Sequence, residues 1–324
     1  MRIVVPAGGI GAARFLRGLL AATSGAGRAT DITVIGNTAD DITLHGLRVC
    51  PDLDTVMYTL GGGIHEAQGW GRTDETFAVA AELAAYDAGP DWFTLGDRDL
   101  ATHLVRTRML GLGYPLSQVT EALCARWAPG VRLLPMTDDP VETHVVLDAD
   151  DGQGERAVHF QEWWVRLHAA VPARRIVVVG VERSRPAPGV LDALRDADLV
   201  LLPPSNPVVS IGTILAVPGV RDALRGTRAP VVGVSPIVGG APVRGMADAC
   251  LRAIGVETSA DAVAGLYADF LDGWLVDTGD AHLAGRGTPG SRAVVQARPL
   301  LMTDVPATAE IASAAVALGE QVRR

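Results

Sequence analysis

Short runs of valine, isoleucine and leucine recur along the chain and alternate with amphipathic stretches. Turn-forming residues bound each run, which is typical of strands buried on both faces of a parallel sheet. We expect such strands at residues 3–5, 32–35, 176–179, 199–202 and 231–234, and helices at 12–20, 189–197 and 220–225. Strands that alternate with helices predict an α/β fold: a three-layer, Rossmann-like core around a parallel sheet.

Residues 61–134 have a different pattern, because helical stretches at 74–86, 100–109 and 117–127 follow one another without a convincing strand. We therefore divide the chain into an α/β core, residues 1–60 and 135–324, and a helical insertion, residues 61–134. The insertion is expected to cover the carboxyl edge of the sheet, where open α/β sheets bind ligands. The later pattern predicts a hairpin of residues 141–147 and 156–160, a mobile loop at 285–291 and a closing helix at 308–322.

Composition narrows the class of protein. Hydrophobic residues make up 48% of the 324 residues, which suffices for a large core, but no apolar run is long enough to span a bilayer. Three scattered cysteines and the lack of a signal-peptide pattern favour a reduced, cytoplasmic protein. A net charge of −9 argues against general nucleic-acid binding. All 28 basic residues are arginine, so any side-chain cation on a phosphate must be a guanidinium.

A glycine turn, formed by Gly8, Gly9 and Gly11, follows the first predicted strand and precedes a helix. Such a turn brings backbone N–H groups and a helix N-terminus towards one point, which suits a phosphate. The spacing matches neither the lysine-containing phosphate loop nor the full dinucleotide fingerprint. Glycines here also serve close packing, so both interpretations stay open at this stage.

Two acidic clusters follow the second predicted strand. Asn37, Asp40 and Asp41 come directly after it, beside the glycine turn, where paired carboxylates suit Mg²⁺. A solvated helix cap is the alternative for this aspartate pair. Asp52 and Asp54 either share one face of an extended strand, or Asp54 caps the helix that follows.

A third cluster contains Asp97, Arg98 and Asp99 and is followed by His103. It forms either a buried group of salt bridges or a site that presents a carboxylate and an arginine to a substrate.

Two later strands end in polar turns, where backbone and side-chain groups of α/β proteins recognise a base or a phosphate. These turns are Ser205-Asn206 and Ser235-Pro236. Trp70 and the pair Trp163-Trp164 are candidates for stacking on a flat ring, although core packing is the commoner use of tryptophan.

Taken together, these motifs resemble the CofD/FbiA family, the 2-phospho-L-lactate transferases of deazaflavin coenzyme biosynthesis. Matching segments occur in the family's order from about residue 8 to residue 245. They are GGIGAARFLRGL, GNTADD, CPDLDTVMYTL, DETF, LGDRDLATHLVRT, LLPMTDDPVETHV, VHFQEWWV, LPPSNPVVSIGTIL and VSPIVGGAPVRG.

The resemblance implies a reaction in coenzyme F-420 biosynthesis. The ribityl hydroxyl of 7,8-didemethyl-8-hydroxy-5-deazariboflavin attacks the phosphorus of a guanosine-diphospho donor that carries lactate or enolpyruvate. GMP leaves, Mg²⁺ is required, and the family favours a homodimer. The resemblance does not distinguish phospholactate from phosphoenolpyruvate as the transferred group.

The resemblance also assigns roles to residues. Asp54 and Arg98 match the residues that contact the deazaflavin, and we expect Asp54→Ala to abolish transfer without harming the fold. Asp40 and Asp41 are expected to hold Mg²⁺ by their position. The donor and acceptor are expected to contact Gly8, Gly9, Gly11, Asn37, Asp97, His103, Ser205, Asn206, Ser235 and Pro236. In the glycine turn, Ile10 and Arg14 stand where the family commonly has threonine and lysine, so the guanidinium keeps the charge.

Two other functions are alternatives to that of a transferase. A non-catalytic regulator of the same fold that binds a nucleotide sugar would share the glycine turn, but would not need the clusters around Asp54 and Arg98. A nicotinamide-dependent dehydrogenase would carry an acidic residue at the end of the second strand, where this chain has Gly36-Asn37.

Overall fold

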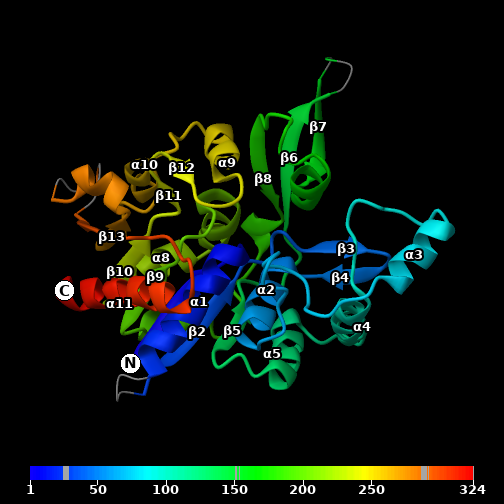
Figure 1. Ribbon diagram of the computed structural model, residues 1–324, viewed down its shortest axis with the longest axis horizontal. Helices are drawn as coiled ribbons and strands as arrows, with labels where there is room; N and C mark the ends of the chain where they lie inside the picture. The colour runs from blue at the N-terminus through cyan, green and yellow to red at the C-terminus, as the bar shows by residue number, and fades with distance from the viewer. Residues whose placement is uncertain (25–28, 150–151, 153, 286–289, 291, 324) are drawn as a thin grey trace.

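A seven-stranded parallel sheet forms the centre of the protein (Figure 1). The computed structural model describes residues 1–324 except 25–28, 150–151, 153, 286–289, 291 and 324. The strands are ordered β14-β13-β10-β9-β1-β2-β5. Their bounds are β1 Arg2–Ala7, β2 Asp31–Gly36, β5 Arg132–Pro135, β9 Leu199–Leu202, β10 Val231–Val234, β13 Gly273–Val276 and β14 Val294–Ala297. Successive strands are added outwards from β1 and then from β9, so the topological switch point lies between these two neighbours.

Helices cover both faces of this sheet. One face is covered by α1 Gly9–Ser24, α2 Pro51–Leu60, α5 Leu116–Trp127 and α11 Val305–Gln321; the other is covered by α6 Val190–Asp196, α7 Thr213–Ala216, α8 Val220–Gly226 and α10 Ala260–Gly265. Side chains alternate along β1, where Ile3 and Val5 pack against the first set of helices and Val4 against the second. The three-layer Rossmann-like core is therefore confirmed.

A second, antiparallel sheet stands beside the first, with strands β6 Glu142–Asp148, β7 Glu155–His159 and β8 Arg175–Val179 in the order β7-β6-β8 (Figure 1). The predicted hairpin is confirmed, because β6 pairs with β7. The assignment of residues 176–179 to the parallel sheet is wrong, since β8 pairs antiparallel with β6. Val177 and Val179 are exposed, so this valine run has one solvated face.

Residues 61–134 form the helices α3 Ala78–Ala85, α4 Asp97–Gly111 and α5. The helical pattern is confirmed at all three places, although α3 begins later than expected. The prediction that this segment lacks a strand is wrong at its end, because β5 starts at Arg132 and pairs with β2. A short hairpin, β3 Ile42–Leu44 and β4 Leu47–Val49, lies against α4. The division into core and insertion stays a prediction.

The remaining elements are η1 Glu162–Arg166, η2 Val181–Arg183, η3 Pro207–Gly212, α9 Ala247–Ala253, η4 Thr278–Leu283, and the strands β11 Ile237–Val238 and β12 Ala241–Pro242. The closing helix is confirmed as α11. Most of the loop predicted at 285–291 lies outside the described residues. Within the described part of the chain, no single helix is long and apolar enough to cross a membrane. The segment Pro207–Ala216 together with α8, bent by 85°, meets that criterion by length and composition only.

Candidate active site

The glycine turn meets the end of β9 at the switch point. Ser205 Oγ donates a hydrogen bond of 2.9 Å to the Gly8 carbonyl oxygen. A Cβ atom at Gly8 would lie 2.7 Å from Ser210 Cβ, and one at Gly11 would lie 2.4 Å from the Pro204 carbonyl oxygen. Close packing of the two strand-end turns therefore requires these glycines. The same close approach brings the N-terminus of α1 to the ligand-binding edge of the sheet.

The side chain of Asp52 connects the start of α2 to the glycine turn and to the turn after β2. The motifs assigned no role to this residue. Its Oδ1 accepts 2.9 Å from the Gly9 N–H, and its Oδ2 accepts 2.8 Å from Asn37 Nδ2. Asn37 Oδ1 in turn accepts from Thr213 Oγ1 at 2.8 Å and from the Ala39 N–H at 3.0 Å. Asn37, expected to bind a ligand, thus holds the ends of β1 and β2 together. Burial raises the pKa of Asp52 to about 6, although Asn37 and Gly9 oppose that shift.

The predictions for the Asp52–Asp54 segment are corrected by the start of α2. The helix begins at Pro51 with Cys50 as N-cap, so the segment is not an extended strand and Asp54 is not a cap. Residues two apart in a helix point to different sides. Asp52 consequently faces the glycine turn, whereas Asp54 faces α4.

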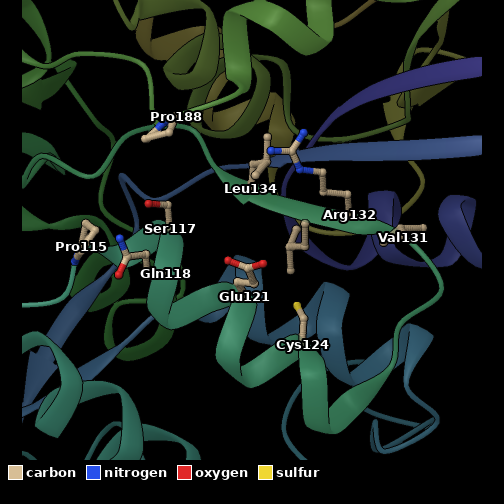
Figure 2. A pocket seen from close by; sticks show the side chains of 10 residues that line it. Pro115, Ser117, Gln118, Glu121, Cys124, Val131, Arg132, Leu134 and Pro188 are labelled. Carbon is tan, nitrogen blue, oxygen red and sulfur yellow. The ribbon is translucent and has the colours of Figure 1, made fainter.

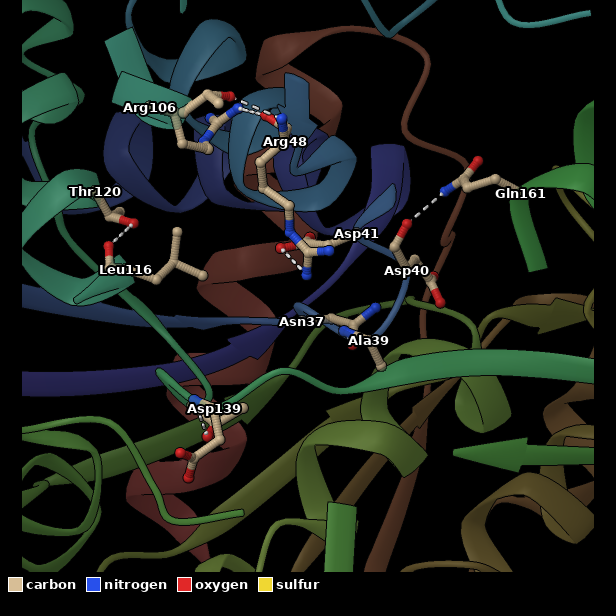
Figure 3. Close-up of polar contacts among 12 residues, drawn as sticks. Asn37, Ala39, Asp40, Asp41, Arg48, Arg106, Leu116, Thr120, Asp139 and Gln161 are labelled. Atoms are coloured by element: carbon tan, nitrogen blue, oxygen red, sulfur yellow. Dashed lines mark hydrogen bonds and ion pairs between the residues drawn. The ribbon is translucent and has the colours of Figure 1, made fainter. Parts of the chain in front are cut away.

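The acidic turn, residues 37–41, is held by the second sheet through its carbonyl groups. The Thr143 N–H donates to the Ala39 carbonyl oxygen at 2.6 Å. Gln161 Nε2 donates to the carbonyl oxygen of Asp40 at 3.2 Å, as Figure 3 shows. His159 Nε2 lies 3.2 Å from the carbonyl oxygen of Asp41. Because His159 Nδ1 accepts from the Gln161 N–H at 3.1 Å, the imidazole proton is on Nε2, which donates to Asp41.

These backbone contacts leave the carboxylates of the turn in the interior, with that of Asp41 directed towards Arg48 (Figure 3). Asp40 and Asp41 are buried, and the alternative of a solvated helix cap is wrong. Burial raises the pKa of Asp40 well above its ordinary value, and the charge of Asp52 raises it further. Burial also raises the pKa of Asp41 to about 7, although Arg48, with Nη2 3.4 Å from Asp41 Oδ2, opposes this (Figure 3).

Three carboxylate oxygens of this region are buried and lack a hydrogen-bond partner among the described residues. They are Asp40 Oδ1, Asp41 Oδ1 and Asp54 Oδ2. An unpaired buried carboxylate oxygen is costly, so these atoms fit a cation. Among the residues that the structure describes, no group of three or more His, Cys, Asp or Glu side chains is arranged to hold a metal ion. Mg²⁺ at Asp40 and Asp41 would therefore need oxygen atoms of a phosphate or of water as further ligands.

Asp54 belongs to a buried network between α2 and α4. It forms an ion pair with Arg106, whose side chain is 2% exposed. His103 Nδ1 lies 3.0 Å from Arg106 Nη1, and His103 Nε2 lies 3.3 Å from Asp99 Oδ2. Tyr58 donates 2.6 Å to Asp99 Oδ1. Burial raises the pKa of Asp54, whereas Arg106 and then His103 oppose that shift. Arg106 lies within the matching segment LGDRDLATHLVRT, but no role was assigned to it; a further signal was its position three residues after His103 on a helix.

The charged cluster at the start of α4 is split between this network and the surface. Asp99 and His103 join the buried network, which confirms the salt-bridge interpretation for them. Asp97 instead accepts from the backbone N–H groups of Ala78 at 2.9 Å and Val79 at 3.0 Å, and so holds the start of α3. Arg98 is exposed, and among the described residues no ion pair joins its side chain to an acid.

The two other strand-end turns use their polar side chains internally. Asn206 Oδ1 accepts from the Val208 N–H at 2.9 Å and caps η3. Ser235 Oγ donates 2.7 Å to the Ile237 carbonyl oxygen, which fixes the turn through Pro236. Both turns lie at the carboxyl ends of their strands, as expected, and a ligand there would meet mainly backbone groups. The binding roles of Ser205, Asn206, Ser235 and Pro236 stay predictions.

Trp163 is buried and donates from its indole nitrogen to the Val171 carbonyl oxygen at 2.9 Å, so core packing, the commoner use of tryptophan, is confirmed for it. Trp70 is 54% exposed. A cavity of about 320 Å³ lies between α5 and the edge strand β5, lined by side chains including Glu121, Cys124 and Leu134 (Figure 2). Among the described residues, no predicted site residue lines it, so it is separate from the strand-end turns.

The fold and these contacts first define a class: a Rossmann-like α/β protein whose buried carboxylates and glycine turn meet at the switch point of the sheet. The chain belongs to the family described as 2-phospho-L-lactate transferase CofD, which matches residues 3–296. It is therefore an enzyme that transfers a phosphate-containing group, and the resemblance drawn from the motifs is confirmed.

Relatives and a solved structure agree with this assignment. Proteins from Kitasatospora aureofaciens and Nocardia farcinica, both named phosphoenolpyruvate transferase, are 67% and 57% identical to this chain. The alignments cover 100% and 98% of this chain, and 99% and 94% of the relatives. The crystal structure of protein BH3568 from Bacillus halodurans has 17% identity and a TM-score of 0.61, over 97% of this chain and 98% of that one. That likeness shows the shared fold.

Proposed function

We propose that the protein transfers a phosphoenolpyruvyl group, or its saturated 2-phospho-L-lactyl counterpart, from a guanosine-diphospho donor to the ribityl hydroxyl of a deazaflavin. The observation that carries this proposal is the two unpaired buried carboxylate oxygens of Asp40 and Asp41, in the turn that Asn37 and Asp52 connect to the N-terminus of α1. Such a set suits a metal–phosphate complex. The relatives' name favours the enolpyruvyl group.

In this reaction the hydroxyl oxygen forms a bond to the phosphorus that carries the enolpyruvyl group. The bond from that phosphorus to the GMP oxygen breaks, GMP leaves with the electron pair, and the proton of the hydroxyl passes to the departing phosphate or to water. Asp40 and Asp41 would hold Mg²⁺, which supplies positive charge at the phosphates when bound. The glycine turn and the Ser205 and Ser235 turns would present backbone groups to the donor.

The acceptor is assigned to the other side of α2. Asp54 is held by Arg106, and its Oδ2, which lies 3.8 Å from His103 Nδ1 and has no hydrogen-bond partner among the described residues, would accept the hydrogen bond of the attacking hydroxyl. Arg98, exposed at the start of α4, would contact the deazaflavin ring system. These roles follow from the family resemblance, and the position of Asp54 in the first turn of α2 supports them.

The test uses the purified protein with the deazaflavin, Mg²⁺ and either donor. We expect release of GMP together with a phosphorylated deazaflavin, and mass spectrometry of that product identifies the transferred group. The absence of both products with both donors would contradict the proposal. Tight nucleotide-sugar binding without turnover would instead favour the non-catalytic regulator.

A further inference from the structure

Two arginines lie near the glycine turn, on segments far apart in the sequence. Arg14 lies on α1, one helical turn after Ile10, and Arg244 follows β12. Arg244 donates to the Gln68 carbonyl oxygen, and its guanidinium carbon lies 5.9 Å from the ring centroid of Trp70. A Cβ atom at Gly69 would lie 2.8 Å from Ile10 Cγ2 and 3.5 Å from Arg244 Nη1. The segment 68–70 therefore connects the start of α1 to Arg244.

Arg14 follows Ile10 by four residues on α1 and so lies on the same side of the helix, the side that contacts the segment bound to Arg244. Partial burial lowers the pKa of Arg244, and the charge of Arg14 lowers it further. Among the residues that the structure describes, no ion pair joins Arg14 or Arg244 to an acid. Arg17, three residues beyond Arg14 on α1, by contrast forms an ion pair with Glu66 at 3.0 Å. In a protein with a net charge of −9, an uncompensated arginine pair beside the ligand edge is a place for an anion.

The position of the pair favours a carboxylate over the diphosphate. The backbone of the glycine turn faces Asp52 and the acidic turn, which is the side assigned to the metal and the phosphates. Arg14 lies one turn further along α1, on the same side as Ile10, which lies against Gly69 next to the exposed Trp70. Both candidate transferred groups carry a carboxylate next to the bridging oxygen, and a guanidinium matches a carboxylate in forked geometry.

We propose that Arg14 and Arg244 form a binding site for the carboxylate of the group that is transferred, with Trp70 as its outer wall. This proposal rests on the function proposed above and adds a specificity site to it. The pair discriminates the full donor from GDP, because GDP has the diphosphate and lacks the carboxylate. Arg14 thereby has a role different from a contact with the phosphates of the glycine turn.

The test measures binding of the donor and of GDP separately by calorimetry, with Mg²⁺ present. We expect Arg14→Gln and Arg244→Gln each to weaken donor binding at least about tenfold, with GDP binding unchanged within about twofold. Arg17→Gln is the matched control on the same helix and is expected to leave both affinities unchanged. Thermal unfolding of each variant verifies that it is folded.

Two results would overturn the assignment. An equal loss of GDP and donor affinity would place the arginines on the diphosphate, and unchanged donor affinity in both variants would remove them from the site. Failure of the unaltered protein to bind either the donor or GDP would instead refute the proposed function, and the carboxylate site with it.

Discussion

At the scale of single residues, the pairing of Asp54 with Arg106 changes what a substitution there means. Both side chains are buried, and each supplies most of the charge compensation of the other. Removing one partner leaves a buried charge without compensation, which commonly costs about 3–5 kcal/mol. Asp54→Ala is therefore expected to destabilise the fold, in contrast to the expectation drawn from the sequence alone.

A double-mutant cycle separates this structural effect from a chemical one. We expect Asp54→Ala and Arg106→Met each to lower the free energy of unfolding by about 3–5 kcal/mol, and the double variant to lose much less than the sum. Urea denaturation measures these values. Arg108→Met, at an exposed position on the same helix, is expected to stay within about 0.5 kcal/mol of the unaltered protein. Additive losses in the cycle would show that the pair is not energetically coupled.

The site residues that the sequence predicted have positions set by the local pattern, whereas those that it did not predict have positions set by contacts between distant segments. The glycines and the aspartates of the acidic turn lie in the turns after β1 and β2, so a local pattern locates them. Asp52 depends on where α2 begins, and Arg106 depends on the packing of α4 against α2. Neither condition is encoded in the neighbouring sequence, because both arise from contacts between distant segments.

At the scale of elements, the start of helix α3 is held by Asp97 of α4, and Glu75, which precedes α3, accepts from the N–H groups of Arg98 and Asp99. Helix α3 has no buried side chain, and Asp97 accepts from two N–H groups at its start. The hydrogen bond from Thr76 and then those two backbone bonds lower the pKa of Asp97. A lowered pKa means that this stabilisation is present above the ordinary carboxyl value and is lost as the pH falls through the native value.

We therefore expect the start of α3 to open in acid, below about pH 4, while the central sheet stays folded. Hydrogen exchange at the amides of Ala78 and Val79, corrected for intrinsic rates, measures this opening. Asp97→Ala should cause the same loss of protection at neutral pH, whereas Glu82→Gln on α3 should not. Full protection of both amides in Asp97→Ala would show that another contact holds the helix.

The strands show what a local hydrophobic pattern can and cannot predict about a sheet. The runs of β1, β2, β9 and β10 predicted the centre of the parallel sheet correctly, because all four are buried on both faces. The valine run of β8 has the same composition but pairs antiparallel in the small sheet. The outer strands β5, β13 and β14 were missed, although they are as long as β9 and β10. Strand partners are non-local, so composition indicates a strand without indicating its sheet.

At the scale of the whole molecule, the two sheets meet at the acidic turn. The main sheet delivers this turn at the end of β2, and the second sheet binds its three successive carbonyl oxygens through Thr143, His159 and Gln161. Contacts with both sheets thus fix the positions of the Asp40 and Asp41 carboxylates. A cation bound to them would stabilise the arrangement of the two sheets as well as the turn itself.

This arrangement predicts that Mg²⁺ raises the thermal midpoint and that Gln161 controls the size of the rise. At a metal concentration one hundred times the dissociation constant, binding contributes about 2.7 kcal/mol. In a protein of 324 residues each kcal/mol raises the midpoint by roughly 1–2 °C. Gln161→Met removes the hydrogen bond to the Asp40 carbonyl oxygen. The Asp40 carboxylate is then less well positioned for the metal, so Mg²⁺ should raise the thermal midpoint by less.

Calorimetric scans with Mg²⁺ and with a chelator give this difference for each variant. Glu162→Gln is the matched control, because its side chain pairs with Arg166 and not with the acidic turn. Its response to Mg²⁺ should equal that of the unaltered protein, although loss of that pair changes the midpoint itself slightly. A general loss of stability in Gln161→Met would lower the thermal midpoint equally with Mg²⁺ and with the chelator. Weaker metal binding by a misplaced Asp40 carboxylate would lower the midpoint with Mg²⁺ more. An undiminished rise in Gln161→Met would therefore show that the metal does not depend on the second sheet.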